Sequence, residues 1–214
     1  MKAESQTYIG TDESGKGDFF GPLVIAGVLV TTRSLKRLEE IGVRDSKRIS
    51  DNRVTALGTI IRKQFPNSIV VIGPERYNEL YDKIRNLNRL LAWGHARAIE
   101  NILEKQECGC ALTDQFGDEK FVKNALLEKG KKIELVQRPK AEEDLAVAAA
   151  SILARGEFVR RLKNLSKTCG VDLPKGCSSD IVGVGKELTE KFGAEILRKT
   201  AKYHFKTTKQ ILAG

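Results

Sequence analysis

Two apolar segments joined by a short glycine-punctuated turn open the chain, and they constrain its fold more than any other feature. Tyr8–Thr11 is a short strand candidate, and the β-branched apolar run Pro22–Thr31 predicts a buried strand. The turn between them begins with residues 12–18, Asp-Glu-Ser-Gly-Lys-Gly-Asp. Because a connection this short favours an antiparallel pair, we expect a mixed sheet rather than a purely parallel one.

The rest of the chain alternates between strand-like and helical segments. Further strands are predicted at Ser68–Ile72, Cys110–Thr113 and Lys132–Gln137. Helices are predicted at 35–40, 51–63, 74–80, 87–103, 121–129, 141–165, 188–192 and 194–203, with a glycine- and serine-rich loop at 170–185. This alternation favours one α/β domain that covers residues 1–214 and has a central sheet.

Hydropathy and cysteine content exclude several classes of protein. The longest apolar stretches, 23–30 and 145–154, are well short of the roughly 18 residues that a membrane span needs. Residues 1–6 are polar and no signal-peptide core follows, so we expect a cytoplasmic protein without a membrane partner. The spacing of Cys108, Cys110, Cys169 and Cys177 does not suit zinc, and we expect reduced thiols.

Positive charge is concentrated toward the C-terminus. The formal net charge is +9, and residues 155–214 hold 13 Lys and Arg against 6 Asp and Glu. Such a bias suits a surface that meets a polyanion, although a solvated, solubilising surface would look the same. Nucleic acid is a better candidate than a membrane, because no basic helix with bulky aromatic anchors stands out.

Carboxylates lie where strands and helices end. Asp12 and Glu13 end one predicted strand, Asp114 ends another, and Glu142 lies in the predicted first turn of a long helix. Ligands bind at strand ends in α/β folds, and an all-oxygen donor set suits Mg²⁺ or Mn²⁺. In a basic protein, such a metal pair suits hydrolysis of a phosphodiester. Each acid also has an ordinary interpretation, as a turn residue or a partner of the helix dipole.

The step Gly15-Lys16-Gly17 also has two interpretations. Two glycines around a lysine let the backbone approach a phosphate or a sugar closely, with the lysine as counter-charge. The alternative is a tight turn between two strands. The step is not part of a P-loop, because the full P-loop pattern is missing there.

Eleven residues, Asp12 to Pro22 (DESGKGDFFGP), resemble the opening signature of the type 2 ribonucleases H, and most closely that of ribonuclease HIII. Further segments resemble the same family in the same order along nearly the whole chain: 45–47 (DSK), 86–96 (NLNRLLAWGHA), 113–116 (TDQF), 140–142 (KAE), 148–155 (AAASILAR) and 202–208 (KYHFKTT). The glutamate at 142 and the lysine at 16 are similar to ribonuclease HIII rather than to its sister enzyme, ribonuclease HII.

The resemblance implies a fold and an activity. The expected fold is ribonuclease H-like, with a mixed central β-sheet flanked by helices and a helical C-terminal part. The expected activity is endonucleolytic cleavage of the RNA strand of RNA/DNA hybrids, which leaves 3′-hydroxyl and 5′-phosphate ends. Two Mg²⁺ or Mn²⁺ ions per site are expected to assist it, and we expect a monomer.

The resemblance also assigns residues. The four acids of the family correspond to Asp12, Glu13, Asp114 and Glu142, with Asp12 bridging both metals, Glu13 and Asp114 completing the coordination, and Glu142 on the water side. Expected substrate-binding residues are Gly15, Lys16 and Gly17 at 2′-hydroxyls of the RNA, Ser46 and Lys47 at phosphates, and Lys202, His204 and Lys206 at the DNA strand. For His204 the alternative is a helix residue packed against the sheet. We expect His95 and Trp93 in or near the core, without a direct role.

One departure from the family and two alternative functions remain. Ribonucleases HIII usually carry an N-terminal substrate-binding domain, for which residues 1–6 leave no room, so we expect hybrid affinity to rest on the basic C-terminal segment. One alternative is cleavage at single ribonucleotides embedded in DNA, although lysine at position 16 lacks the bidentate fork of an arginine. The other is a catalytically silent binding module, against which the four acids argue.

Overall fold

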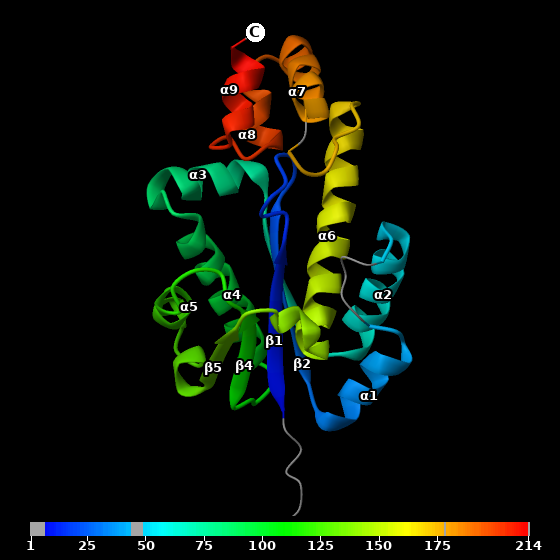
Figure 1. Cartoon of the computed structure of the whole chain (residues 1–214), viewed down its shortest axis with the longest axis vertical. Coiled ribbons are helices and arrows are strands. Elements are labelled where there is room, and N and C mark those ends of the chain that lie inside the picture. Colours follow the sequence, from blue (N-terminus) through cyan, green and yellow to red (C-terminus); the bar gives the residue numbers. More distant parts are fainter. Residues whose placement is uncertain (1–6, 44–48, 178, 214) are drawn as a thin grey trace, which may run out of the picture. The chain divides into compact units, whose positions relative to one another are not determined.

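The computed structural model describes residues 7–43, 49–177 and 179–213, and it contains a five-stranded sheet with helices around it (Figure 1). The strands are β1 (Tyr8–Ser14), β2 (Leu23–Val30), β3 (Asn67–Ile72), β4 (Cys110–Asp114) and β5 (Glu134–Arg138), in the order β3-β2-β1-β4-β5. All five agree with the predicted strands to within a few residues. The pairs β1–β4 and β4–β5 are parallel, and the sheet as a whole is mixed, as predicted.

Helices make up most of the remaining chain. They are α1 (Thr32–Glu40), α2 (Asp51–Gln64), α3 (Pro74–Ile84), α4 (Leu87–Leu103), α5 (Lys120–Ala125), α6 (Leu145–Cys169), α7 (Ser179–Phe192), α8 (Ile196–Thr200) and α9 (Lys206–Leu212), with short 3₁₀ turns η2 (Gly130–Lys132) and η3 (Ala141–Glu143). Among the described residues, none of the helices has the length and apolar character that a transmembrane segment requires. The four cysteines are free thiols.

The chain divides into two compact units. Unit 1 contains residues 1–13, 25–70 and 86–156, and unit 2 contains residues 14–24, 71–85 and 157–214. Most of the sheet, α1, α2, α4, α5 and the N-terminal half of α6 belong to unit 1. Unit 2 holds the glycine turn, α3 and the C-terminal helices. The expectation of a single domain over residues 1–214 stays a prediction.

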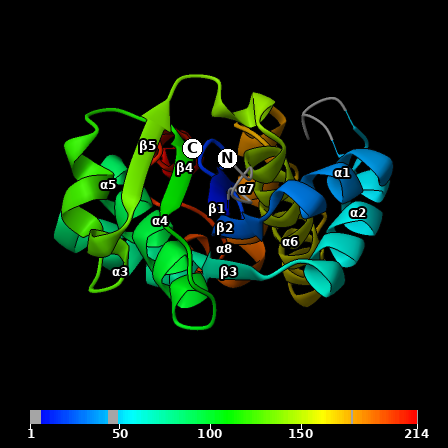
Figure 2. The same ribbon diagram turned by 90° about the horizontal axis from the view of Figure 1, so that it is seen from below.

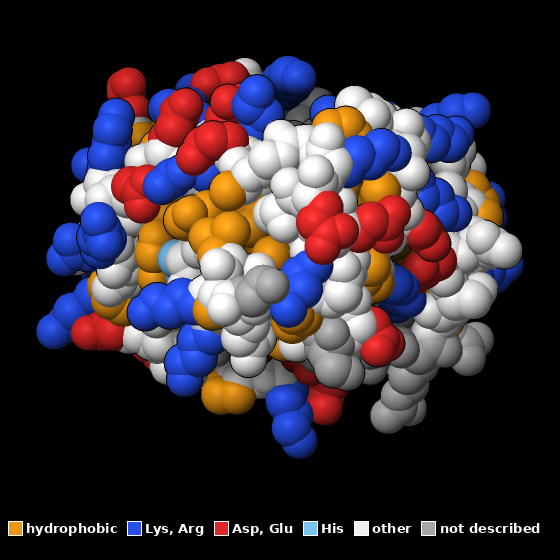
Figure 3. All heavy atoms as spheres, turned by 90° about the horizontal axis from the view of Figure 1, so that it is seen from above, with side chains coloured by type: hydrophobic (Ala, Val, Ile, Leu, Met, Phe, Trp, Pro, Cys, Tyr) orange, Lys and Arg blue, Asp and Glu red, His pale blue; other side chains and the backbone are white. Residues whose placement is uncertain are grey.

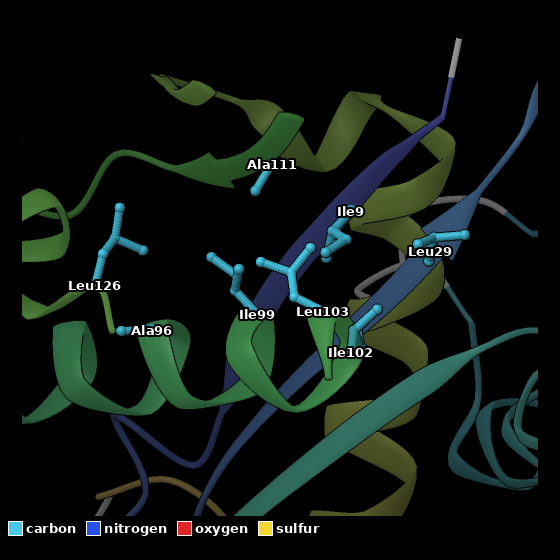
Figure 4. Packing of buried hydrophobic residues seen from close by; sticks show 8 residues of the cluster. All are labelled: Ile9, Leu29, Ala96, Ile99, Ile102, Leu103, Ala111 and Leu126. Carbon is cyan, nitrogen blue, oxygen red and sulfur yellow. The ribbon is translucent and has the colours of Figure 1, made fainter. Parts of the chain in front are cut away.

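Helices cover both faces of the sheet in unit 1 (Figure 2). On one face, Ile9 of β1 packs in an apolar cluster together with residues of α4, and Figure 4 shows this packing. The cluster consists of Ile9, Leu29, Ala96, Ile99, Ile102, Leu103, Ala111 and Leu126. On the opposite face, Gly10 lies against the start of α6, where a Cβ atom would come within 2.4 Å of the backbone of Ala146 and Val147. Glycine at position 10 therefore lets α6 lie directly on β1.

Several of the predicted helix boundaries were wrong, and two of them affect the packing and the candidate site. Residues 170–185 were predicted as a loop, but α7 begins at Ser179. The glycine that misled this prediction, Gly185, is needed for packing, because a Cβ atom there would come within 2.2 Å of Ile211 in α9. The long helix was predicted from residue 141, but α6 begins at Leu145, after the separate turn η3.

Candidate active site

Strand alternation sends the two acids that end β1 to opposite faces of the sheet. Successive side chains of a strand point to opposite faces, so Asp12 follows Gly10 toward α6 and Glu13 follows Thr11 toward α4. The contacts agree: Asp12 hydrogen-bonds to Ser151 of α6, and Glu13 lies 3.2 Å from the ring of His95 in α4. Two adjacent carboxylates thus occupy both sides of one strand end.

Asp114 reaches the same region from the neighbouring strand. Thr11 of β1 pairs with Thr113 of β4 in a parallel register, so Asp12 and Asp114 each come directly after the last pair between these two strands. The charges of Glu13 and Asp114 both act on Asp12, so both carboxylates lie within electrostatic range of it. The sequence predicted this meeting of strand ends, and the register of β1 and β4 produces it.

Glu142 lies on η3, one residue after a direct link to Asp114. The backbone N–H of Ala141 donates to Oδ1 of Asp114 at 3.1 Å. Lys140, just before η3, has φ 56° and ψ 35°, a left-handed conformation that is uncommon for a residue with a side chain. The sequence placed Glu142 in the first turn of the long helix, and the structure corrects this to the 3₁₀ turn that precedes it.

Asp144 fixes the junction between η3 and α6. Its Oδ1 accepts the backbone N–H of Ala146 at 2.9 Å and that of Val147 at 3.4 Å, which is the pattern of a helix N-cap. The hydroxyl of Tyr8 donates to both carboxylate oxygens of Asp144, at 3.1 and 2.9 Å. The start of β1 therefore holds the cap of α6, two residues beyond Glu142.

The electrostatics of these residues fit a divalent cation. Burial, then the charge of Glu13 and to a smaller degree that of Asp114, raises the pKa of Asp12 to about 7, against a hydrogen bond from Ser151 that lowers it. This raised pKa of Asp12 results from the exclusion of water around it and from repulsion between the carboxylates, and a bound cation relieves that repulsion. The donors are all oxygens, which suits Mg²⁺ or Mn²⁺.

The carboxylates do not form a preformed set of metal ligands. Within residues 7–43, 49–177 and 179–213, the structure contains no ready-made group of three or more His, Cys, Asp or Glu side chains arranged to hold a metal ion.

Sequence reasoning missed the contact that His95 makes. The ring is fully buried, as predicted, and its Nε2 lies 3.2 Å from Oε2 of Glu13, a contact that the prediction of a core residue without a direct role did not include. Trp93 was also placed in or near the core, whereas its side chain is 40% exposed. The contact depends on the position of His95 in α4, on the helix face that covers the end of β1.

In unit 2, the glycine turn has a backbone that only glycine permits at its first position. Gly15 has φ +89°, and a Cβ atom there would lie 2.2 Å from the carbonyl oxygen of Pro22. Gly17 differs, because it is exposed and a Cβ atom would meet no described atom within 4 Å. Packing and backbone conformation therefore explain why residue 15 is a glycine. Packing does not explain why residue 17 is one.

The segment after this turn is bound to the C-terminal part of unit 2. The backbone N–H of Phe19 donates to the carbonyl of Gly176 at 2.8 Å, and Phe20 forms an antiparallel bridge with Ala201. The ammonium of Lys202 donates to the carbonyls of Asp18 at 2.8 Å and Gly21 at 3.0 Å.

These contacts correct one predicted substrate ligand. Lys202 is fully buried, so its ammonium does not reach a DNA strand at the surface. Burial lowers its pKa to about 7, an effect that the charge of Asp18 opposes. Its role in the structure is to hold the backbone that follows Gly15-Lys16-Gly17.

The other predicted substrate ligands divide into two groups. His204 and Lys206 are both exposed; His204 lies in a turn rather than a helix, and its ring stacks on Tyr81 at 3.8 Å between centroids. Burial, followed by the charge of Lys202, lowers the pKa of His204. Ser46 and Lys47 lie outside the described residues.

The face that carries α7 and α9 has a mixed charge. Figure 3 shows Lys and Arg side chains there, interleaved with Asp and Glu and set around an area of hydrophobic side chains. On this face, positive charge is thus interleaved with acids rather than gathered in one uniform patch.

The comparisons with known proteins agree with these features. A family model described as ribonuclease HII matches residues 9–208. Ribonuclease HIII of Protochlamydia amoebophila is 49% identical over 211 residues, which cover 99% of this chain and 70% of that protein. Ribonuclease HIII of Chlamydia pneumoniae is 44% identical over 209 residues, which cover 96% of this chain and 70% of that protein.

A solved structure extends the likeness to the fold. The crystal structure of Bst-RNase HIII in complex with Mn²⁺ matches with a TM-score of 0.90 and 28% identity, over 99% of this chain and 71% of that one. The predicted ribonuclease H-like fold is confirmed, and the family depends on divalent metal ions. The chain therefore belongs to the ribonuclease HII family and is a ribonuclease H-type hydrolase.

Proposed function

We propose that this chain cleaves the RNA strand of RNA/DNA hybrids endonucleolytically and leaves 3′-hydroxyl and 5′-phosphate ends. The observation that carries the proposal is the strand-end cluster, in which Asp12, Glu13 and Asp114 meet and the turn of Glu142 is tied to Asp114. The curated relatives named ribonuclease HIII support the same activity.

The four acids, in this proposal, hold two Mg²⁺ or Mn²⁺ ions. When bound, such ions activate a water molecule for attack on the phosphodiester and stabilise the leaving oxygen. Asp12 would be the central ligand of this set, because the charges of Glu13 and Asp114 both act on it. Glu13, Asp114 and Glu142 would supply the other carboxylates that hold the ions.

Recognition of RNA is proposed to lie in the glycine turn that follows Glu13 in the chain. The exposed backbone at Gly17 has room for a sugar edge, and a 2′-hydroxyl is the group that distinguishes RNA from DNA. Lys16 supplies a counter-charge for the adjacent phosphate. His204 and Lys206 remain proposed contacts for the DNA strand, and Ser46 and Lys47 remain proposed phosphate contacts.

A panel of three substrates tests this function. The chain is incubated with an RNA/DNA hybrid, with single-stranded RNA and with a DNA duplex that contains one ribonucleotide, in Mg²⁺ and then in Mn²⁺, with Asp12→Asn as the inactive control. We expect cleavage of the hybrid by the wild type only. Cleavage at the single ribonucleotide alone would assign the activity of the sister enzyme. Hybrid binding without cleavage in either metal would indicate a binding module.

A further inference from the structure

His95 is the buried polar side chain next to the strand-end cluster whose role the proposed function leaves open. It lies on α4, is fully buried, and has a polar partner at each ring nitrogen. Its neighbour Gly94 brings α4 close to the sheet, because a Cβ atom at position 94 would come within 2.5 Å of Ile25. This close approach lets the His95 ring lie among the ends of β1 and β4.

Three side chains fix one edge and one face of the ring. Nδ1 lies 2.8 Å from Oγ1 of Thr11 and 3.3 Å from Oγ1 of Thr113, two residues that are paired in the sheet and fully buried. The ring of Phe116 stacks on the imidazole at 5.0 Å between centroids and 28° between planes. The imidazole thus has one orientation, set by two strands and a loop.

The opposite edge of the ring points at a catalytic carboxylate. Nε2 of His95 lies 3.2 Å from Oε2 of Glu13, whose side chain is 13% exposed. An ionised carboxylate only accepts hydrogen bonds, so this contact requires a proton on Nε2. A threonine hydroxyl both donates and accepts, so Thr11 satisfies Nδ1 whether or not that nitrogen is protonated.

We propose that His95 is a positioning residue, which donates a hydrogen bond from Nε2 to Glu13 and thereby fixes this carboxylate for metal binding. The inference rests on the proposed function, because it takes Glu13 as a metal-binding acid. Carboxylates that bind metals are held by hydrogen-bonding partners behind them, and loss of such a partner costs about 10- to 100-fold in metal affinity or activity.

Two substitutions separate positioning from packing. The side-chain amide of glutamine extends to the place of Nε2, so His95→Gln retains a donor toward Glu13. The shorter asparagine places its amide near Nδ1, beside Thr11, so His95→Asn retains a buried polar group but no donor toward Glu13. Both variants carry a side-chain amide at position 95, and they differ only in how far that amide extends toward Glu13.

Calorimetric titration with Mn²⁺ compares both variants with the wild type, without requiring catalysis. We expect His95→Asn to weaken Mn²⁺ binding by about 10- to 100-fold and His95→Gln to recover most of that loss. The Mn²⁺ concentration for half-maximal hybrid cleavage should shift in the same way, while the KM for hybrid stays unchanged. Equal losses in the two variants, or none in either, would overturn the positioning role.

Imidazole nitrogen NMR of the wild-type chain gives a test that does not depend on any variant of His95. The chain has two histidines, and the exposed His204 is assigned by His204→Gln. We expect His95 to carry a proton on Nε2 and its signals to move when Mg²⁺ is added, with those of His204 unchanged. An unprotonated Nε2 would refute the hydrogen bond to Glu13.

The outcomes distinguish this inference from the proposed function. If the wild type binds Mn²⁺ and cleaves hybrid, but His95→Asn does so equally well, only the role of His95 fails. If the wild type binds no Mn²⁺ at all, the proposed function fails, and with it the metal-directed role of His95.

Discussion

Lys202→Met replaces a buried ammonium by an apolar side chain of similar length, and its effect on stability should depend on pH. In the wild type, Nζ donates to the carbonyls of Asp18 and Gly21. The methionine variant leaves both carbonyls without that donor, at about 1–3 kcal/mol each. It also avoids the burial of a charge, which opposes this loss. The balance between the two effects changes as Lys202 titrates.

The sign of the pH effect follows from the lowered pKa. Burial brings the pKa of Lys202 from 10.5 to about 7. Between these values the unfolded chain binds a proton that the folded chain does not, so the free energy of unfolding rises with pH. Below the folded pKa both states are protonated and the contribution is flat. At about 1.36 kcal/mol per pKa unit, the contribution of Lys202 rises by about 2.5 kcal/mol between about pH 6 and about pH 9.

Urea unfolding followed by circular dichroism measures this contribution as a difference. The free energies of unfolding of the wild type and Lys202→Met are compared at each pH, so that the titrating groups that do not interact with Lys202 cancel. We expect the wild type to gain about 2.5 kcal/mol relative to the variant over this range. Lys206→Met, at an exposed lysine, is the control and should show no such change. A difference between wild type and Lys202→Met that is constant with pH would refute the reasoning.

Four further substitutions test other parts of the account. Gly10→Ala forces a Cβ atom to within 2.4 Å of the backbone of α6 and should cost about 3 kcal/mol, seen as a lower Tm; an unchanged Tm would contradict the close packing. Glu100→Gln removes one of the two carboxylate oxygens that accept the backbone amides at 129–130, and should cost about 2 kcal/mol in urea unfolding. Gly17→Ala should fold normally and raise the KM for hybrid, whereas Gly15→Ala should destabilise the fold by about 1–3 kcal/mol because of its positive φ. A normal KM in Gly17→Ala would separate this glycine from substrate binding.

The sheet and the strand-end acids were predictable because their signals are local. Apolar β-branched runs mark buried strands, and all five strands agree with those predictions to within a few residues. The meeting of Asp12 and Asp114 needed only the expectation that strand ends share an edge of the sheet, and the register of β1 with β4 meets it.

The misses came from contacts that only the three-dimensional structure supplies. The glycine at position 185 was interpreted as part of a loop, but it lies in α7, where Ile211 of α9 packs against it and leaves no room for a side chain. Lys202 read as a surface cation, because nothing local reveals that a lysine is enclosed by carbonyls from residues far along the chain. Asp144 is an exception, since an aspartate before an apolar helical run is a known N-cap signal and would have moved the start of α6 past Glu142.

The central claim is that the acid cluster at the strand ends cleaves the RNA of a hybrid, and one paired measurement tests it most directly. Glu142 lies on the turn tied to Asp114, and its neighbour Glu143 is exposed. The cleavage rate of an RNA/DNA hybrid in Mn²⁺ is measured for the wild type, Glu142→Gln and Glu143→Gln. The account predicts a loss of at least about 100-fold in Glu142→Gln and a wild-type rate in Glu143→Gln. Equal rates in the two variants would contradict it.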